Sequence, residues 1–113
     1  MHLCGNIRQW VIAGLGGHKD VRERQKEFDE QGPIPLEELL GLLSVLKKDV
    51  ETVLNEVTAE DLIKKRSVQI YQESGLSILV HVVEHFSYHV GQVTYVVKML
   101  KDVDTGYYAG QDL

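Results

Sequence analysis

The sequence contains one cysteine, Cys4, among its 113 residues. A single cysteine cannot form a disulfide within the chain, and a chain without an internal disulfide fits a reducing cytoplasm. The start of the chain also lacks the charged and then apolar pattern of a secretory signal peptide, because Met1 is followed directly by His2-Leu3-Cys4-Gly5-Asn6. We therefore expect a cytoplasmic protein.

Basic residues are few and scattered. The chain has 12 Lys and Arg against 17 Asp and Glu, a net charge of -5, and its only short basic runs are Lys47-Lys48 and Lys64-Lys65-Arg66. A phosphate backbone requires a clustered basic face, so we expect no nucleic-acid partner. Internal repeats, low-complexity tracts and domain boundaries are also lacking. With 43% hydrophobic residues, the sequence predicts a single domain over residues 1–113.

The longest apolar stretch, Leu76 to Leu100, could be mistaken for a membrane span. As a helix with a rise of about 1.5 Å per residue it is long enough to cross a bilayer. Charged and titratable groups in lipid are costly, however, and this stretch includes His81, Glu84, His85, His89 and Lys98. We expect a helix inside a bundle and no membrane partner.

Apolar periodicity predicts three substantial helices. The first runs from Leu3 to Leu15, the second begins at Pro35 or Leu36 and has apolar positions up to Val57, and the last is capped by Ser74 and ends near Lys101. The middle one has apolar residues at every third or fourth position, the stripe of an amphipathic helix. Glycines 14, 16 and 17 are expected to end the first.

The connecting segments are more varied. Residues 18–34 form a long polar connection with a possible helical turn across Val21 to Glu30, and long connections are often functional. Thr58 to Asp61 has the pattern of an N-cap before a short turn. We expect Ser67 to Glu73 to be an extended connector rather than a paired strand, and residues 102–113 to be irregular.

Three helices make an incomplete all-α bundle. Antiparallel bundles usually close with four helices, and the last helix here is apolar nearly all round. Contiguous apolar surface usually marks an interface. We therefore expect a partner chain, a second copy forming a dimer, to complete the bundle.

Three histidines, His81, His85 and His89, recur every four residues within the apolar last helix. Residues four apart share a helix face, and imidazole is the commonest protein ligand for transition metals. The alternative is that each ring is hydrogen-bonded in the core. We favour a metal for His85 and His89, and a supporting or core position for His81, which is offset around the helix.

Other residues near this motif are expected to play supporting parts. Glu84 completes an H-x-x-E-H pattern, but too few residues follow for the further acidic ligand of such proteases, so we expect it away from the metal. Tyr88 and Gln92 are placed to hydrogen-bond along one face. Gly91 would let another helix approach closely. Cys4 is expected to be a small buried apolar residue, and His18 to be solvated.

Two segments resemble the DinB/YfiT-like superfamily: His2-Leu-Cys-Gly-Asn6-Ile-Arg-Gln-Trp10 and His85-Phe-Ser-Tyr-His89-Val-Gly-Gln92. Its members are bacterial four-helix bundles that usually hold a metal on three histidines. The resemblance extends over nearly the whole chain and is strongest with an uncharacterised branch. It implies His2, His85 and His89 as metal ligands, with zinc or nickel as the ion.

The resemblance also implies a first helix that the sequence lacks. We expect that the chain is a fragment, that its start was assigned downstream, or that oligomerisation replaces this helix. Characterised members of the superfamily include thiol S-transferases, so a metal-dependent enzyme acting on a small thiol and an electrophile is the leading functional hypothesis. The alternatives are a non-catalytic oligomerising protein with a structural or vestigial histidine site, and a metal-dependent hydrolase.

Overall fold

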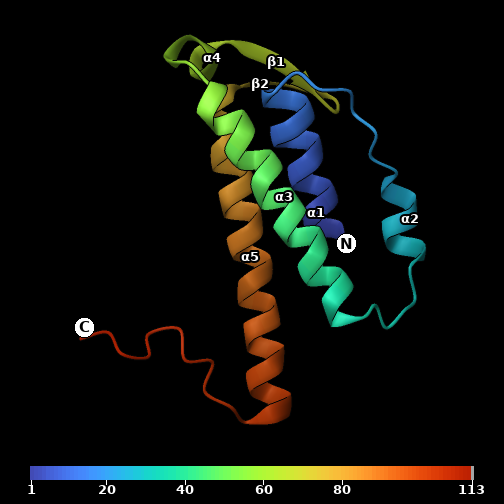
Figure 1. Cartoon of the computed structure of the whole chain (residues 1–113), viewed down its shortest axis with the longest axis vertical. Coiled ribbons are helices and arrows are strands. Elements are labelled where there is room, and N and C mark those ends of the chain that lie inside the picture. The colour runs from blue at the N-terminus through green and yellow to red at the C-terminus, as the bar shows by residue number, and fades with distance from the viewer. Residues whose placement is uncertain (113) are drawn as a thin grey trace. The chain divides into compact units, whose positions relative to one another are not determined.

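The computed structural model describes residues 1–112, which are mostly helical with one small two-stranded sheet (Figure 1). The all-α prediction is therefore right in outline. The chain falls into two compact units, a first unit (Met1–Val83) and a second unit (Glu84–Leu113). The last helix, α5 (Gly75–Lys101), begins in the first unit and continues in the second.

The first predicted helix consists of α1 (His2–Ile7) and a π-helical continuation, η1 (Arg8–Leu15). In η1 the wider turn is seen in the N–H of Gly16, which donates to the carbonyl of Val11, five residues earlier, at 2.8 Å. The apolar pattern did not distinguish this turn from an α-helical one. Gly17 then takes a left-handed conformation with φ of +71° and ends the helix as predicted.

The middle helix is confirmed as α3 (Leu36–Glu56), with Glu37 and Glu38 in its first turn, where acidic side chains favour the helix dipole. Only part of its apolar stripe is buried. Leu46 and Val53 are buried, whereas Leu36, Leu40, Leu43 and Leu54 are exposed. The long connection before it contains α2 (Arg24–Asp29), within the range where a helical turn was expected.

After α3, Thr58 caps the short helix α4 (Ala59–Ile63), as predicted. Its hydroxyl accepts from the N–H of Asp61 at 3.2 Å, while the Asp61 carboxylate accepts from the N–H of Thr58 at 3.1 Å. This reciprocal pair is a capping box.

The expectation of an unpaired connector over Ser67 to Glu73 is wrong. Strands β1 (Lys65–Val68) and β2 (Tyr71–Ser74) pair antiparallel, with Val68 opposite Tyr71. Gln69 adopts φ of 55° in the two-residue turn between them. Such turns usually contain Asn or Gly at left-handed positions, and the absence of that signal explains the error. Val68 is buried where its side chain meets Gly14, a position at which a larger residue would collide with it.

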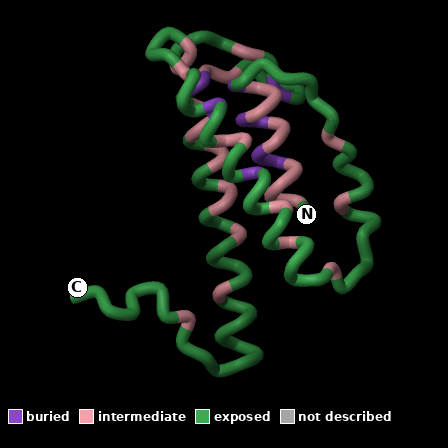
Figure 2. The backbone as a smooth tube through the Cα atoms, in the orientation of Figure 1, coloured by how far each residue is buried: buried purple, intermediate pink, exposed green. Residues whose placement is uncertain are grey.

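The buried apolar side chains of the described residues all belong to the first unit (Figure 2). They are Ile7, Trp10, Val11, Leu15, Leu46, Val53, Val68 and Ile78. Helix α5 contributes Ile78 to this core and starts at a cap, because the N–H of Ser77 donates to the Ser74 hydroxyl at 3.1 Å. Its continuation in the second unit exposes apolar residues instead, among them Val93, Tyr95, Met99 and Leu100.

Candidate metal centre

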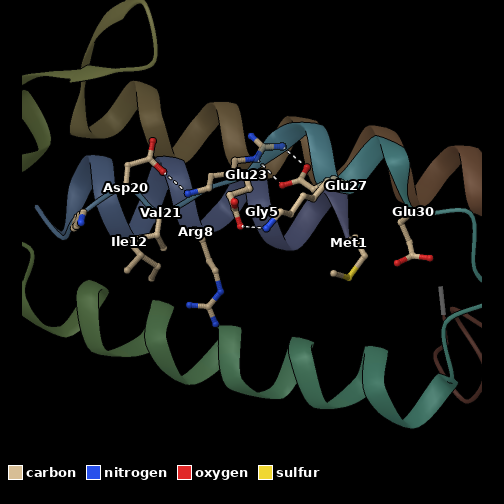
Figure 3. A pocket seen from close by; sticks show the side chains of 12 residues that line it. Met1, Gly5, Arg8, Ile12, Asp20, Val21, Glu23, Glu27 and Glu30 are labelled. Atoms are coloured by element: carbon tan, nitrogen blue, oxygen red, sulfur yellow. Dashed lines mark hydrogen bonds and ion pairs between the residues drawn. The ribbon is translucent and has the colours of Figure 1, made fainter.

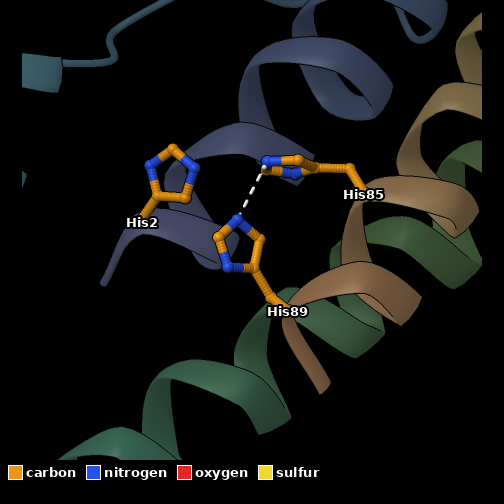
Figure 4. A group of neighbouring side chains, drawn as sticks. All are labelled: His2, His85 and His89. Carbon is orange, nitrogen blue, oxygen red and sulfur yellow. Dashed lines mark hydrogen bonds between the residues drawn. The ribbon is translucent and has the colours of Figure 1, made fainter. Parts of the chain in front are cut away.

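The two histidines of the H-x-x-x-H pair lie together on the part of α5 that belongs to the second unit (Figure 4). Their Nε2 atoms are 3.2 Å apart, and the rings meet edge to face, with centroids 4.7 Å apart and an angle of 88° between planes. Adjacent helix turns thus bring two imidazole nitrogens to one point, as the four-residue spacing indicated.

Tyr88 and Gln92 support this pair from the same helix. The Tyr88 ring lies 5.3 Å from the His89 ring, centroid to centroid, in an edge-to-face arrangement. The Gln92 amide donates to the Tyr88 hydroxyl at 3.0 Å, as predicted. The aromatic contact restricts the orientation of the His89 ring, and the hydrogen bond restricts that of Tyr88.

The third predicted ligand, His2, belongs to the first unit, where it is the first residue of α1. Its ring contacts the connection that follows η1. The Nδ1 atom lies 3.3 Å from Nη2 of Arg22 and 3.4 Å from Oε2 of Glu27, and the ring centroid is 6.0 Å from that of Phe28. His2 is therefore held by side chains of the connection, three of which approach its ring.

Arg22 and Glu27 form a bidentate ion pair inside the first unit. Arg22 donates from Nε to Oε1 at 2.8 Å and from Nη2 to Oε2 at 2.7 Å, and from Nη1 to the Gln9 side chain at 2.9 Å. Only 3% of the Arg22 side chain and 10% of the Glu27 side chain are exposed. The Arg22 hydrogen bond, helped by the charge of Arg22, holds the pKa of Glu27 below its ordinary value despite burial.

Sequence reasoning missed this ion pair. Arg22 and Glu27 are five residues apart within a segment that is charged throughout, so nothing in the pattern separates them from their solvated neighbours. The length of the connection was the only relevant signal, because long connections often have functional roles.

A cavity of about 360 Å³ lies beside α1, η1 and this connection, within the first unit (Figure 3). Arg8 and Ile12 of η1 line it, opposite Val21, Arg22 and Glu27 of the connection. Arg8 also donates to Asp49 of α3 at 2.8 Å, so its charge is already paired. Of the polar residues in this part of the chain, Arg8 lines the cavity, whereas Asn6 is buried and Gln9 binds Arg22.

The remaining histidines and Cys4 belong to the first unit. His81 stacks on the buried Trp10, with ring centroids 3.9 Å apart, so it packs against the core of the first unit. Glu84 and His18 are exposed. Cys4 is a free, half-buried thiol. These positions leave His81 in a packing role, in keeping with its offset from His89.

Comparison with known proteins gives a family but no activity. A family model described as "Protein of unknown function (DUF1572)" matches residues 1–107. The chain belongs to the DUF1572 family. No curated protein and no solved structure matches it. Within residues 1–112, none of the helices combines the length and hydrophobicity needed to cross a membrane.

Proposed function

We propose that this DUF1572 protein binds a divalent metal ion through His2, His85 and His89. The observation that carries the proposal is the 3.2 Å separation between the Nε2 atoms of His85 and His89. Two nitrogens bound to one tetrahedral ion at about 2.0–2.1 Å are roughly 3.4 Å apart. The histidine pair of the second unit therefore has nearly the spacing that a shared ion requires.

His2 enters the proposal through the sequence. The segment from His2 to Trp10 resembles the part of DinB/YfiT-like proteins that supplies their first histidine ligand, and the family match includes all three histidines. Neutral imidazoles suit zinc and nickel. Because each ligand nitrogen must be deprotonated, binding should weaken as the pH falls through the range in which histidine titrates.

We further propose a reaction of the thiol S-transferase type. A divalent ion held at the proposed site would lower the pKa of a thiol bound to it. The chain's own residues would then have defined tasks: the three histidines would hold the ion, and Tyr88 restricts the His89 ring. In the overall reaction the thiol sulfur bonds to an electrophilic carbon, whose leaving group departs, and the thiol proton is released to solvent.

Calorimetric titration with Zn²⁺ or Ni²⁺ alone tests the site. The wild type should bind one ion per chain, and His85→Ala and His89→Ala should each abolish this binding. His18→Ala is the matched control, because it removes an exposed histidine from the connection and should change nothing. Wild-type protein that takes up neither ion would overturn the proposal.

Activity measurements separate the enzymatic hypotheses. Coupling of a small thiol to an activated aryl halide, lost in His85→Ala and His89→Ala, would support the transferase. The same ligands serve a metal-dependent hydrolase, and thiol-independent cleavage of an activated ester would favour that activity instead.

The contact between His85 and His89 also supports a non-catalytic alternative. At 3.2 Å, one neutral ring is able to donate a hydrogen bond to the other, which makes the pair a structural element of α5. In that case the wild type and His85→Ala should alike show neither metal uptake nor thiol transfer.

We also propose that a second copy of the chain is the partner. The support is the series of exposed apolar residues in the second unit, including Val93, Val96, Val97 and Leu100. Light scattering coupled to size-exclusion chromatography should give a dimer for the wild type and a monomer for Val97→Lys. Thr105→Lys, which places the same charge outside this series, should remain dimeric, and a monomeric wild type would contradict the proposal.

A further inference from the structure

We propose that Glu27, fixed by Arg22, is a positioning residue that orients His2 for metal binding by accepting a hydrogen bond from its Nδ1–H group. This inference rests on the proposed function, because it concerns one of the three proposed ligands. It assigns a purpose to the long connection, whose residues otherwise have no part in the histidine site.

Two neighbours of the His2 Nδ1 atom, Arg22 and Glu27, require different protonation states of this nitrogen. A guanidinium has only donors, so a hydrogen bond from Arg22 requires an unprotonated Nδ1 and places the ring proton on Nε2. A carboxylate has only acceptors, so in a neutral ring a hydrogen bond to Glu27 requires the proton on Nδ1 and leaves Nε2 without one. Only the second tautomer presents Nε2 as a metal ligand.

Both groups lie within reach of Nδ1, and the charge of the acceptor favours Glu27 as its partner. The Arg22 guanidinium donates its three shorter hydrogen bonds, of 2.7–2.9 Å, to both Glu27 oxygens and to Gln9, and its longer contact, of 3.3 Å, is with Nδ1. The Glu27 Oε2 atom, 3.4 Å from Nδ1, has a further lone pair, and an ionised acceptor makes the stronger hydrogen bond. Arg22 thus fixes the position of the Glu27 carboxylate, and this carboxylate favours the His2 tautomer that has its proton on Nδ1.

Burial makes this arrangement specific. With 3% and 10% of their side chains exposed, Arg22 and Glu27 are held in place by their surroundings, so the carboxylate keeps its position beside Nδ1. Carboxylates that hold the second nitrogen of a metal-binding histidine in this way raise the basicity of the ligand and fix the ring. The neighbouring acid Glu23 differs, because it is exposed and pairs with Lys26.

The contrast between Glu27 and Glu23 provides the experiment. Zn²⁺ titrations should show affinity weakened by about 10- to 100-fold in Glu27→Gln and unchanged in the matched variant Glu23→Gln. Nitrogen-15 spectra of the metal-free protein should show the His2 proton on Nδ1 in the wild type and in Glu23→Gln, with a shift toward Nε2 in Glu27→Gln. Unchanged affinity and an unchanged tautomer in Glu27→Gln would overturn the inference.

A second variant controls for misfolding, because Glu27→Gln removes the negative charge that pairs with the buried Arg22 side chain. Replacing both residues, Arg22→Met with Glu27→Met, removes the charges together, which proteins often tolerate. Circular dichroism should show native helix content, and Zn²⁺ binding should weaken as in Glu27→Gln. Wild-type affinity in the folded double variant would overturn the positioning role.

The outcomes also separate this inference from the proposed function. If His2→Ala abolishes or weakens binding but Glu27→Gln does not, the metal site stands and the positioning role falls. If His2→Ala binds Zn²⁺ like the wild type, His2 is no ligand and the inference falls, while His85 and His89 remain. If the wild type binds no ion, both proposals fail.

Discussion

The first and second units share the apolar helix α5, but the buried apolar residues of the described chain lie only in the first unit. Ile78 and Leu100 belong to the same helix, α5, yet Ile78 is 0% exposed and Leu100 is 70% exposed. The difference lies in the neighbours: Ile78 is part of a core to which η1, α3 and β1 also contribute. Apolar periodicity predicts a helix, whereas the burial of its residues depends on what packs against it.

The glycines of α5 show the same contrast. A Cβ atom added at Gly75 would collide with the carbonyl oxygen of Asp61, and a Leu15 methyl carbon would be only 2.9 Å away. A Cβ atom at Gly91 meets nothing within 4 Å. Gly75 is therefore needed for packing in the first unit, while Gly91 would be needed only if another helix packed on the second.

The largest effect is expected from a cavity in the core. Ile78→Ala should lower the free energy of unfolding by about 2–5 kcal/mol, because it removes buried methyl groups that the surroundings cannot replace. Leu100→Ala, at an exposed position on the same helix, should change it by less than about 0.5 kcal/mol at concentrations where the chain is monomeric. Urea unfolding followed by circular dichroism measures both, and equal losses would contradict the comparison.

Paired alanine substitutions at the two glycines sharpen the comparison. Gly75→Ala should destabilise the protein by about 1–3 kcal/mol through overpacking. Gly91→Ala should stabilise it by about 0.5–1 kcal/mol, because alanine is the better helix former at an open position. The same urea experiment decides the signs. A destabilising Gly91→Ala that also weakens self-association would instead show that a second copy packs on this face.

A smaller loss is expected from removing the α4 cap. Thr58→Ala leaves the N–H of Asp61 without its side-chain acceptor and should cost about 1 kcal/mol. Thr52→Ala is the control, since the Thr52 hydroxyl only donates to the carbonyl of Lys48 within α3. Equal effects of the two substitutions would show that the cap adds nothing to the stability of the first unit.

Much of the fold follows from local patterns. The apolar stripe predicted α3, the Thr58 and Ser74 caps placed α4 and α5, and Gly17 ended the first helix. The hairpin was missed because Gln69 occupies a turn position without the residues that usually mark it. The π-helical turn of η1 was missed because an apolar pattern does not report which carbonyl each N–H reaches.

The candidate site was predictable only where it is local. The contact between His85 and His89, and that between Tyr88 and Gln92, follow from four-residue spacing on one helix. The Arg22–Glu27 pair depends on how a charged connection folds back on η1, and the apolar periodicity of the sequence does not encode that path. The side chains that hold His2 therefore required a structure.

The pH dependence of unfolding tests whether polar contacts, in addition to the apolar core, stabilise the first unit. Hydrogen bonds from the Thr58 side chain and backbone, with a smaller contribution from Arg66, hold the pKa of Asp61 below its ordinary value of 3.8. Because the unfolded chain binds the proton more readily, the stability that ionised Asp61 contributes is present above about pH 4 and is lost as the pH falls through the lowered pKa. Asp61→Asn should therefore show a shallower loss of urea resistance between about pH 5 and pH 3 than the wild type. Glu60→Gln, at an exposed position on the same helix, should lose urea resistance with falling pH as steeply as the wild type. An equally steep loss in Asp61→Asn would show that the capping box does not contribute to the acid sensitivity of the protein.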